Sequence, residues 1–550
     1  MNNIRLHTFL PILPFLASVL LWLSYHPANL NWLVWVSLVP LFLYIYYERR
    51  KNRLVLLVWA GGFLFFVLGL FWLRHVSWPG LFIVSFIMGG YFGLFAWLAK
   101  FIRNRYDPVV FLWSLPFLWV ALEYLRSFIF SGFPWFFLAH TQYRWLSFIQ
   151  IADLAGTYLI SFIILMTNIL VALIIIKSGH RPAGHSGLKK RVFKERNVVI
   201  TGLVTIILLI FAQVYGAVRL KKLDLKPGPK IGIVQGNIEQ GLKLYGDADE
   251  IYHKQCALTE RLIEESGPAQ ISSGPDLIIW PETMYPYPVG FNVLDLKENL
   301  CLVNAAERLT NTAKNFQRPM LVGVLTREVG NKTKHHFNSA YYLKPDGTIL
   351  NRYDKIHLVP FSEAATLRSI SPALERFALN FTELEEFFNL SPGKDIVSMN
   401  LGNYRFGVLI CYESIFPELV RANAEKGNQF IINISNDGWF KNSAELDQML
   451  AITVFRCVEN KISIVRATNT GISAFIEPSG AFTVCQNEQG QFKEIAGAWA
   501  KNISLCPATA ISGPSRTIYS QWGDYFPLVC AVVFMSLAVL SFLKSVQAVS

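Results

Sequence analysis

The chain has 550 residues with a formal net charge of +12, and 53% of the residues are hydrophobic. This length is too great for one hydrophobic core, and the apolar fraction is too high for an ordinary soluble protein. The composition therefore excludes a small soluble domain. The apolar residues concentrate in 8–220 and 526–545, whereas residues 221–525 have the composition of a soluble domain. The sequence predicts a membrane protein with one large domain in water.

Eight apolar segments have about the 20 residues that a helix needs to cross a bilayer. They are residues 9–25, 30–47, 54–73, 80–99, 109–129, 151–176, 198–218 and 526–543. We expect a polytopic α-helical membrane domain with seven of these helices in residues 1–220. Residues 221–525 would then form the catalytic domain, and residues 526–550 the eighth helix and a tail.

The basic residues alternate between the two sides of this predicted topology. Four Lys or Arg residues lie in 49–53, three in 100–105 and seven in 177–196, whereas the short connections on the other side carry only Arg74 and Arg144. The positive-inside rule places such basic connections in the cytoplasm. We therefore expect cytoplasmic N- and C-termini and an external domain at 221–525. The positive charge is explained by topology, so no nucleic-acid partner is predicted.

The membrane part holds few ionisable residues, and its fifth predicted span contains two of them. Glu123 and Arg126 are three residues apart, so they share a helix face. We expect a structural ion pair that fixes helix packing. The following external loop, residues 131–143, reads SGFPWFFLAHTQY and is aromatic and nearly uncharged. Its rings suit the headgroup level of a bilayer, as an interfacial belt or as the floor of a lipid-facing site.

Residues 221–525 alternate between apolar strand-like runs and helical stretches. Strands are predicted at 231–238, 276–283, 319–325, 339–343, 348–355, 406–411, 429–435, 463–468 and 473–477, with helices near 250–266, 294–316, 416–426 and 445–460. This pattern indicates a layered α/β domain. Residues 364–392 interrupt it with exposed-looking apolar groups. They are expected to form either a lipid-dipping arm or a packed helical hairpin.

Three polar residues each follow an apolar strand in the predicted α/β domain. Glu282 ends IIWPE, Lys355 follows a hairpin strand, and Cys411 ends FGVLIC. Each alone is more often structural, but α/β folds collect their sites at equivalent strand ends. Together the three supply a base, a cation and a nucleophile. The seven cysteines contain no C-x-x-C pair, so neither a zinc site nor a disulfide framework is predicted.

These motifs and their order resemble the carbon-nitrogen hydrolase (nitrilase) superfamily, whose fold is an α-β-β-α sandwich. The resemblance extends over nearly the whole chain to the apolipoprotein N-acyltransferase family. It rests on SGFPW, VQGNI, WPE, KxHLVPFSE, CYE, SNDGWF and RATNTG, framed by seven predicted spans before and one after. The resemblance therefore implies a nitrilase-like external domain joined to a membrane domain.

The resemblance also implies roles for single residues. Glu282 would be the general base, Cys411 the nucleophile and Lys355 the cation that stabilises the oxyanion. A free thiol titrates near ~8.5, so the chemistry needs Glu282 as base and Lys355 to favour thiolate. The supporting positions are two carboxylates that would orient Lys355 and tune its charge, and two aromatic residues around the acyl pocket: Glu363 and Glu413, and Tyr412 and Trp439.

The chain departs from the family pattern at three positions. Ser362 stands where Gly is common, Met449 where many members have His, and Leu244 where an aromatic residue is frequent, although Tyr245 is adjacent. These departures leave Glu282, Lys355 and Cys411 in place. They put in doubt only details of lipid contact.

The implied reaction moves an acyl chain from a phospholipid to the α-amino group of a diacylglyceryl-cysteine apolipoprotein, through a thioester on Cys411. This is the last step of bacterial lipoprotein maturation, and both substrates would use one site in turn, giving ping-pong kinetics. The implied location is the bacterial inner membrane, with membrane lipids as partners, a periplasmic catalytic domain and no metal or cofactor. Two alternatives are a membrane-tethered amidase acting on a small soluble amide and a non-catalytic transporter or scaffold.

Overall fold

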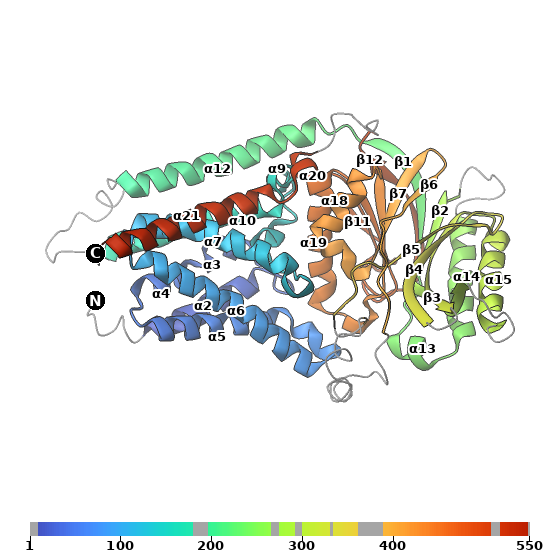
Figure 1. The fold of residues 1–550 in the computed structure, drawn as a ribbon. Coiled ribbons are helices and arrows are strands. Elements are labelled where there is room, and N and C mark those ends of the chain that lie inside the picture. The colour runs from blue at the N-terminus through green and yellow to red at the C-terminus, as the bar shows by residue number, and fades with distance from the viewer. Residues whose placement is uncertain are drawn as a thin grey trace. The chain divides into compact units, whose positions relative to one another are not determined.

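The structure is a computed structural model that describes residues 9–179, 196–265, 274–291, 300–329, 334–360, 363, 389–507 and 517–547. The predicted arm at 364–392 lies outside the described residues except for its last four positions, and Ser362 also lies outside them. The chain divides into two compact units. One contains residues 1–222 and 522–550, and the other contains residues 223–521 (Figure 1). We call them the helical unit and the α/β unit.

The helical unit contains six described helices that are long and apolar enough to cross a membrane. They are α5 (Lys51–Gly69), α6 (Trp78–Arg103), α7 (Pro108–Phe128), α10 (Thr157–Gly179), α12 (Arg196–Lys221) and α21 (Tyr525–Gln547). Each corresponds to one of the predicted spans from the third to the eighth. A multi-pass membrane protein is therefore indicated, while the count of eight spans stays a prediction.

The first two predicted spans are shorter helices. The first comprises η1 (Leu10–Ile12) and α2 (Leu13–Leu23), and the second comprises η2 (Asn31–Leu33), α3 (Val34–Ser37) and α4 (Val39–Tyr47). The helix breaks between α3 and α4 beside a proline at the second position of α4, which has no N–H to donate.

A buried amide side chain repairs this break. Asn168 on α10 donates to the carbonyl of Val34 and accepts from the backbone N–H of Leu38, at 2.9 Å each. Non-helical backbone in an apolar environment requires such partners. The sequence periodicity missed the break because the flanking residues remain apolar.

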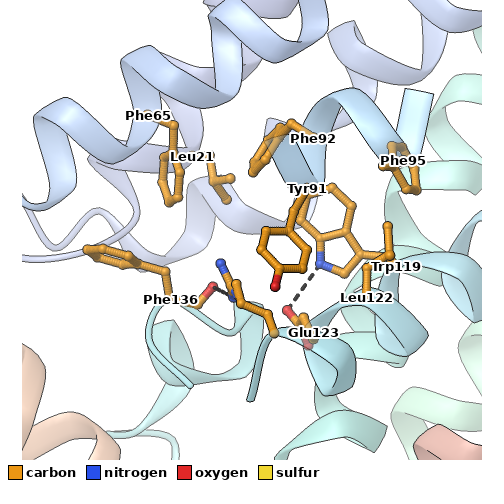
Figure 2. Close-up of a pocket in the computed structure, with 10 residues that line it drawn as sticks. Leu21, Phe65, Tyr91, Phe92, Phe95, Trp119, Leu122, Glu123 and Phe136 are labelled. Carbon is orange, nitrogen blue, oxygen red and sulfur yellow. Dashed lines mark hydrogen bonds between the residues drawn. The ribbon is translucent and has the colours of Figure 1, made fainter. Parts of the chain in front are cut away.

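Glu123 and Arg126 hold the aromatic loop that follows α7. Glu123 Oε1 accepts from the backbone N–H of Leu138 at 3.0 Å. Arg126 Nη2 donates to the carbonyl of Phe136 at 3.4 Å (Figure 2). The sequence predicted that this pair fixes helix packing, whereas its hydrogen bonds go mainly to the loop. The rings of Phe136 and Phe137 are buried, so they do not form the expected belt at the headgroup level.

The α/β unit contains two six-stranded sheets. The first has the order β12-β1-β2-β3-β4-β5, with β1 (Lys226–Gln235), β2 (Leu277–Phe291), β3 (Met320–Val329), β4 (Lys334–Leu343), β5 (Ile349–Asp354) and β12 (Gly497–Leu505). The second has the order β11-β10-β9-β8-β7-β6, with β6 (Ser398–Leu401), β7 (Tyr404–Ile410), β8 (Phe430–Ser435), β9 (Ser463–Thr468), β10 (Ala474–Ile476) and β11 (Phe482–Val484). Parallel pairs lie at the centre of each sheet and antiparallel pairs at the edges.

The main core lies between the two sheets. Apolar side chains from both meet there, among them Ile279 and Leu321 of the first sheet and Val408 and Ile432 of the second. The outer face of the first sheet packs against α14 (Ala248–Glu265) and α15 (Leu300–Phe316). Beside the second sheet lie α18 (Pro417–Glu425) and α19 (Ala444–Asn460) (Figure 1). The predicted α-β-β-α arrangement of the α/β unit is therefore confirmed.

Two features of the sheets differ from the sequence prediction. β2 continues to Phe291 instead of ending near Glu282, and its pairing with β3 shifts register between Trp280 and Tyr285. Gly323 on β3 makes this irregularity possible, because a Cβ there would lie 2.3 Å from the carbonyl oxygen of Pro281. Glu282 therefore lies on a bulge within a strand and not at the end of one.

The edge strands β6, β11 and β12 were not predicted from the sequence.

Candidate active site

Cys411 is the first residue after β7 and begins the short helix η6 (Cys411–Ile415). Its φ is +54°, in the left-handed region that a residue with a Cβ rarely adopts. Backbone conformations of this kind persist only where the surroundings impose them, and they cluster at functional sites. The chain therefore turns sharply at Cys411 and leaves the direction of β7.

A buried polar network holds this turn in place. Asn433 on β8 donates to the carbonyl of Cys411 at 3.2 Å, and Arg466 Nη1 on β9 donates to Asn433 Oδ1 at 2.8 Å. Arg466 Nη2 also pairs with Asp437 Oδ2 at 2.6 Å, and both of these side chains are fully buried. Side chains of β8 and β9 thus hold the backbone at Cys411, and this limits where its sulfur can lie.

Glu282 is buried on β2 and both of its oxygens are hydrogen bonded. Oε1 accepts from Asn338 Nδ2 at 2.7 Å and lies 3.3 Å from Lys355 Nζ, while Oε2 accepts from the backbone N–H of Asn436 at 2.7 Å. Burial opposes the charged form, but the nearby Lys355 and Lys243 ammonium groups and the hydrogen bonds outweigh it. The pKa of Glu282 is therefore lowered, and Glu282 is an ionised carboxylate that can accept a proton.

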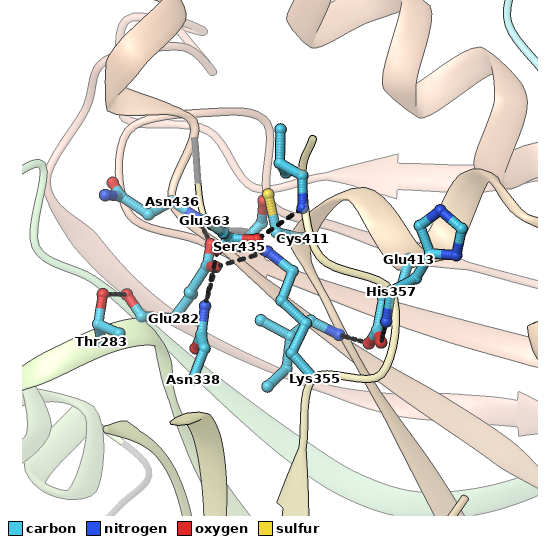
Figure 3. Close-up of polar contacts among 12 residues, drawn as sticks. Glu282, Thr283, Asn338, Lys355, His357, Glu363, Cys411, Glu413, Ser435 and Asn436 are labelled. Atoms are coloured by element: carbon cyan, nitrogen blue, oxygen red, sulfur yellow. Dashed lines mark hydrogen bonds and ion pairs between the residues drawn. The ribbon is translucent and has the colours of Figure 1, made fainter. Parts of the chain in front are cut away.

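Lys355 follows β5 directly and is 1% exposed. Its Nζ lies between two carboxylates, 2.8 Å from Glu363 Oε1 and 3.3 Å from Glu282 Oε1 (Figure 3). Burial lowers its pKa, but the charges of Glu363 and Glu282 overcome this effect and raise the pKa well above the ordinary value for lysine. Lys355 is therefore a fixed cation beside Cys411.

Glu413 acts on the backbone around the site, unlike Glu363, which binds the Lys355 ammonium directly. Its Oε1 accepts from the backbone N–H groups of Ile356 and His357 at 2.6 and 3.0 Å. Its Oε2 accepts from Tyr353 Oη at 2.8 Å and from the backbone N–H of Ile410 at 2.7 Å. Glu413 thus ties the segment after Lys355 to the end of β7. The structure gives it a scaffolding position two residues from Cys411.

The two aromatic residues predicted for the acyl pocket lie on the same short elements. Tyr412 is half-buried next to Cys411, with its ring edge-on to Phe416 at 4.9 Å between centroids. Trp439 is partly exposed on η7 (Asp437–Phe440), three residues after Asn436. The Tyr412 ring also lies 6.0 Å from the ring of His357, measured between centroids. Their part in binding an acyl chain stays a prediction.

The Cys411 thiol is protonated at rest. Burial raises its pKa above the ordinary range and the negative charge of Glu282 raises it further, whereas Lys355 lowers it. Lys355 does favour the thiolate, as the sequence predicted. Its effect on the pKa of Cys411 is smaller than the combined effects of burial and Glu282. Nucleophilic attack by such a thiol requires a base that takes its proton.

Sequence reasoning missed three participants in this site. Asn338 on β4 donates to both Glu282 and Glu363, at 2.7 and 3.3 Å. The backbone N–H of Asn436 binds Glu282, and only the SNDGWF motif signalled its segment. Lys243 lies on α13 (Gln240–Tyr245) near enough for its charge to lower the pKa of Glu282. Within the described residues, no cluster of His, Cys, Asp and Glu could hold a metal ion.

The site combines a thiol, a carboxylate base and a fixed cation at the meeting of two sheets (Figure 3). Such a set can form a covalent intermediate with a carbonyl carbon and stabilise the resulting oxyanion. The α-β-β-α sandwich with this set defines the carbon-nitrogen hydrolase class, and residues 230–495 match the family model described as carbon-nitrogen hydrolase. Residues 17–170 match the family model of the apolipoprotein N-acyltransferase N-terminal domain.

Similar proteins cover almost the entire chain. The apolipoprotein N-acyltransferase of Geobacter metallireducens is 30% identical over 537 residues, covering 96% of this chain and 94% of the relative. The corresponding protein of Chlorobaculum tepidum is 27% identical, with 96% of each chain covered. Apolipoprotein N-acyltransferase 1 of Treponema denticola is 25% identical and covers 97% of this chain and 96% of its own. The chain belongs to the apolipoprotein N-acyltransferase family.

Proposed function

We propose that this protein transfers an acyl chain from a phospholipid to the α-amino group of a diacylglyceryl-cysteine apolipoprotein, through a thioester on Cys411. One observation carries the proposal. In a member of this acyltransferase family, Cys411 lies beside an ionised Glu282 and a Lys355 fixed between two carboxylates. These groups suit nucleophilic attack on an ester carbonyl.

The first half-reaction forms the acyl-enzyme. The Cys411 thiol gives its proton to Glu282 while its sulfur attacks the ester carbonyl of the phospholipid. Negative charge then develops on the carbonyl oxygen, and the Lys355 ammonium stabilises it. Removing a donor of this kind typically costs about 3 kcal/mol of transition-state stabilisation. The glycerol oxygen then leaves with a proton taken from a neighbouring acid of the site, which gives a lysophospholipid and the thioester.

The second half-reaction uses the same site. The α-amino group of the apolipoprotein attacks the thioester carbon and gives a proton to a neighbouring base of the site, the bond to sulfur breaks, and an amide is formed. Glu282 returns its proton to the sulfur, which restores Cys411 as a thiol. Since the lysophospholipid leaves before the amine attacks, the kinetics are ping-pong.

The membrane context supports lipid substrates. Six described helices are apolar and long enough to cross a bilayer, and a small soluble amide requires none of them. The proposed arrangement has eight spans, with membrane segments in 1–220 and 526–550 around a catalytic domain at 221–525. The termini are cytoplasmic and the catalytic domain is periplasmic, at the bacterial inner membrane. The basic residues in 49–53 and 100–105 support this orientation.

Mass spectrometry of the peptide that contains Cys411 tests the proposal. Purified protein is incubated with a phospholipid carrying isotope-labelled acyl chains, and the peptide is expected to gain the mass of one labelled chain. The adduct is released by hydroxylamine and is absent from Cys411→Ala. Adding a diacylglyceryl-cysteine peptide moves the label to the peptide amine. Release of free fatty acid to water, with no labelled peptide, would support the amidase-like alternative instead.

Labelling of introduced cysteines tests the orientation separately. A cysteine at the exposed position 344 of the α/β unit is expected to react with a membrane-impermeant maleimide in intact spheroplasts. A cysteine at position 105, between α6 and α7, is expected to react only after the membrane is opened. The reverse pattern would contradict the proposed topology.

A further inference from the structure

A second lysine lies against the general base of the site. Lys243 on α13 donates a hydrogen bond from its ammonium to the hydroxyl of Thr283, the residue after Glu282. That hydroxyl in turn donates to the carbonyl of Glu282 at 2.8 Å. Among the described residues, Thr283 is the hydrogen-bond partner of this ammonium, and it carries no charge.

A second contact ties α13 to another neighbour of Glu282. Gln240 Oε1 accepts from Asn436 Nδ2 at 3.1 Å, and the backbone N–H of Asn436 donates to Glu282 Oε2 at 2.7 Å. The helix that carries Lys243 is thus tied to two neighbours of the same carboxylate. This geometry holds the Lys243 ammonium at the site although the side chain as a whole is partly exposed.

The two lysines of the site differ in their surroundings. Lys355 contacts two carboxylates, which keep it charged throughout. Lys243 bonds to a neutral hydroxyl, and burial of its ammonium lowers its pKa to about 8, against smaller opposing effects from the charged groups that face it. Those groups are Glu282, Cys411 and Glu363, which raise its pKa, and Lys355, which lowers it further. An amine with such a pKa can both give and take a proton near neutral pH.

We propose that Lys243 is a further catalytic residue, which donates a proton to the leaving glycerol oxygen and later accepts one from the attacking amine. This inference rests on the proposed acyl transfer. In the first half-reaction the thiol proton goes to Glu282, the acyl carbon exchanges its bond to oxygen for a bond to sulfur, and the oxygen takes a proton from Lys243. The acyl-enzyme therefore keeps one proton shared between Glu282 and Lys243, since this pair has taken one proton from the thiol and given one to the alcohol.

The second half-reaction reverses both transfers. The neutral amine attacks the thioester carbon and gives a proton to this pair through Lys243, while the departing sulfur takes a proton from the pair through Glu282. Both residues return to their starting states, and no proton is gained or lost over the cycle. Lys355 cannot replace Lys243 in this role, because its two carboxylate partners hold its proton.

The test compares two acyl donors that differ in their leaving groups. One is a phospholipid, whose alkoxide must be protonated as it leaves. The other is the 4-nitrophenyl ester of the same fatty acid, whose phenolate leaves without a proton. Acylation of Cys411 in the purified full chain is followed by quenched-flow mass spectrometry. The variants are Lys243→Met, Lys243→Arg and the control Lys254→Met, which changes an exposed lysine of α14.

We expect Lys243→Met to slow acylation from the phospholipid by about 100-fold, the lower range for a lost general acid. The same variant should lose far less of its rate with the nitrophenyl ester. Lys243→Arg should stay slow with the phospholipid, because a guanidinium does not release its proton. Lys254→Met should match the wild type with both donors. In the wild type, acylation from the phospholipid should fall as pH rises through about 8, where Lys243 loses its proton.

Three results would overturn the inference. An equal loss with both donors would mean that Lys243 only supports the structure of the site. Recovery of the rate in Lys243→Arg would mean that its charge alone matters. An unchanged phospholipid rate in Lys243→Met would remove it from the reaction. If the wild type itself forms no Cys411 adduct with the phospholipid, the proposed function fails, and the role assigned to Lys243 falls with it.

Discussion

Each unit of the molecule contains a buried cluster of carboxylate and cation, and the two clusters differ in where their hydrogen bonds go. In the helical unit, Glu123 accepts from the indole of Trp119 and from the backbone of Leu138, and Arg126 donates to a backbone carbonyl. In the α/β unit, Lys355 and Glu282 bind each other beside the Cys411 thiol. Burial and charge are common to both clusters. Of the two, the second cluster is the one whose charges act on a thiol, that of Cys411.

This difference teaches how to separate scaffold from chemistry. Glu123 and Arg126 form hydrogen bonds with the backbone of the loop after α7, so they order that loop. A small cavity beside them is lined mostly by aromatic side chains, among them Phe65, Phe92 and Trp119 (Figure 2). We expect changes in the first cluster to alter stability with little effect on rate, and changes in the second to alter rate whether or not they also alter stability.

The largest effect is expected for Lys355→Met. Loss of the fixed cation should lower the rate of Cys411 acylation by about 1000-fold. It also leaves Glu282 and Glu363 buried without their shared cation, which should cost about 3–5 kcal/mol of stability. Adding Glu363→Gln removes one of these charges, so the double variant should recover stability but not rate. Lys344→Met, at an exposed lysine after β4, serves as the control. Recovery of both quantities together would contradict a catalytic role for the cation.

Glu282→Gln should separate two properties of Cys411. Acylation should fall by about 100-fold or more, because the base is lost. Alkylation of Cys411 by iodoacetamide at neutral pH should become faster, since the charge of Glu282 raises the pKa of the thiol. In the wild type, alkylation should increase about tenfold per pH unit between pH 6 and 9, as expected for a thiol well below its pKa. A plateau within that range, or slower alkylation in the variant, would count against the resting thiol.

A smaller effect on rate is expected for Glu413→Gln. The amide keeps one acceptor oxygen but turns an NH₂ group toward donors, including the backbone N–H of Ile410 or of Ile356. We expect a loss of about 1–3 kcal/mol in stability, the range for a buried donor left without its partner. The acylation rate should fall by about tenfold through displacement of the Cys411 and Lys355 segments. An intact rate in a destabilised protein would limit Glu413 to folding.

The smallest effect on rate is expected for Glu123→Leu. Its removal leaves the indole of Trp119 and the N–H of Leu138 without an acceptor, and should cost about 2 kcal/mol of stability. Acylation from the soluble nitrophenyl ester should change by less than about threefold, as for changes outside a site. Glu123→Gln, which keeps one acceptor oxygen, should be less destabilised. A large loss of rate without loss of stability would end the distinction between the two clusters.

Much of this architecture could be predicted from local sequence. Apolar runs located the central strands of both sheets, and the change from apolar to polar residues marked Cys411 and Lys355. Predicting that Glu282, Lys355 and Cys411 lie together requires the order of the strands in the sheets. No local sequence pattern contains that order. The resemblance to a known family supplied that knowledge.

The remainder depends on contacts between distant residues. Asn338 lies just before the predicted strand 339–343, and its role depends on pairing of β4 with β3. Edge strands such as β12 have weak alternation, and they form because a partner is present. The bulge at Glu282 depends on Gly323 in the neighbouring strand. Lys243 follows a polar segment, and only the fold places it beside Glu282.

The most direct test of the central claim is a single transfer from isolated acyl-enzyme. Protein loaded with a labelled acyl chain on Cys411 is freed of phospholipid and then mixed with a diacylglyceryl-cysteine peptide. The account predicts that the label moves from Cys411 to the peptide amine, with one amide formed for each thioester lost. If the thioester persists, or if amide forms only when phospholipid is added back, Cys411 does not carry the acyl chain between the two substrates.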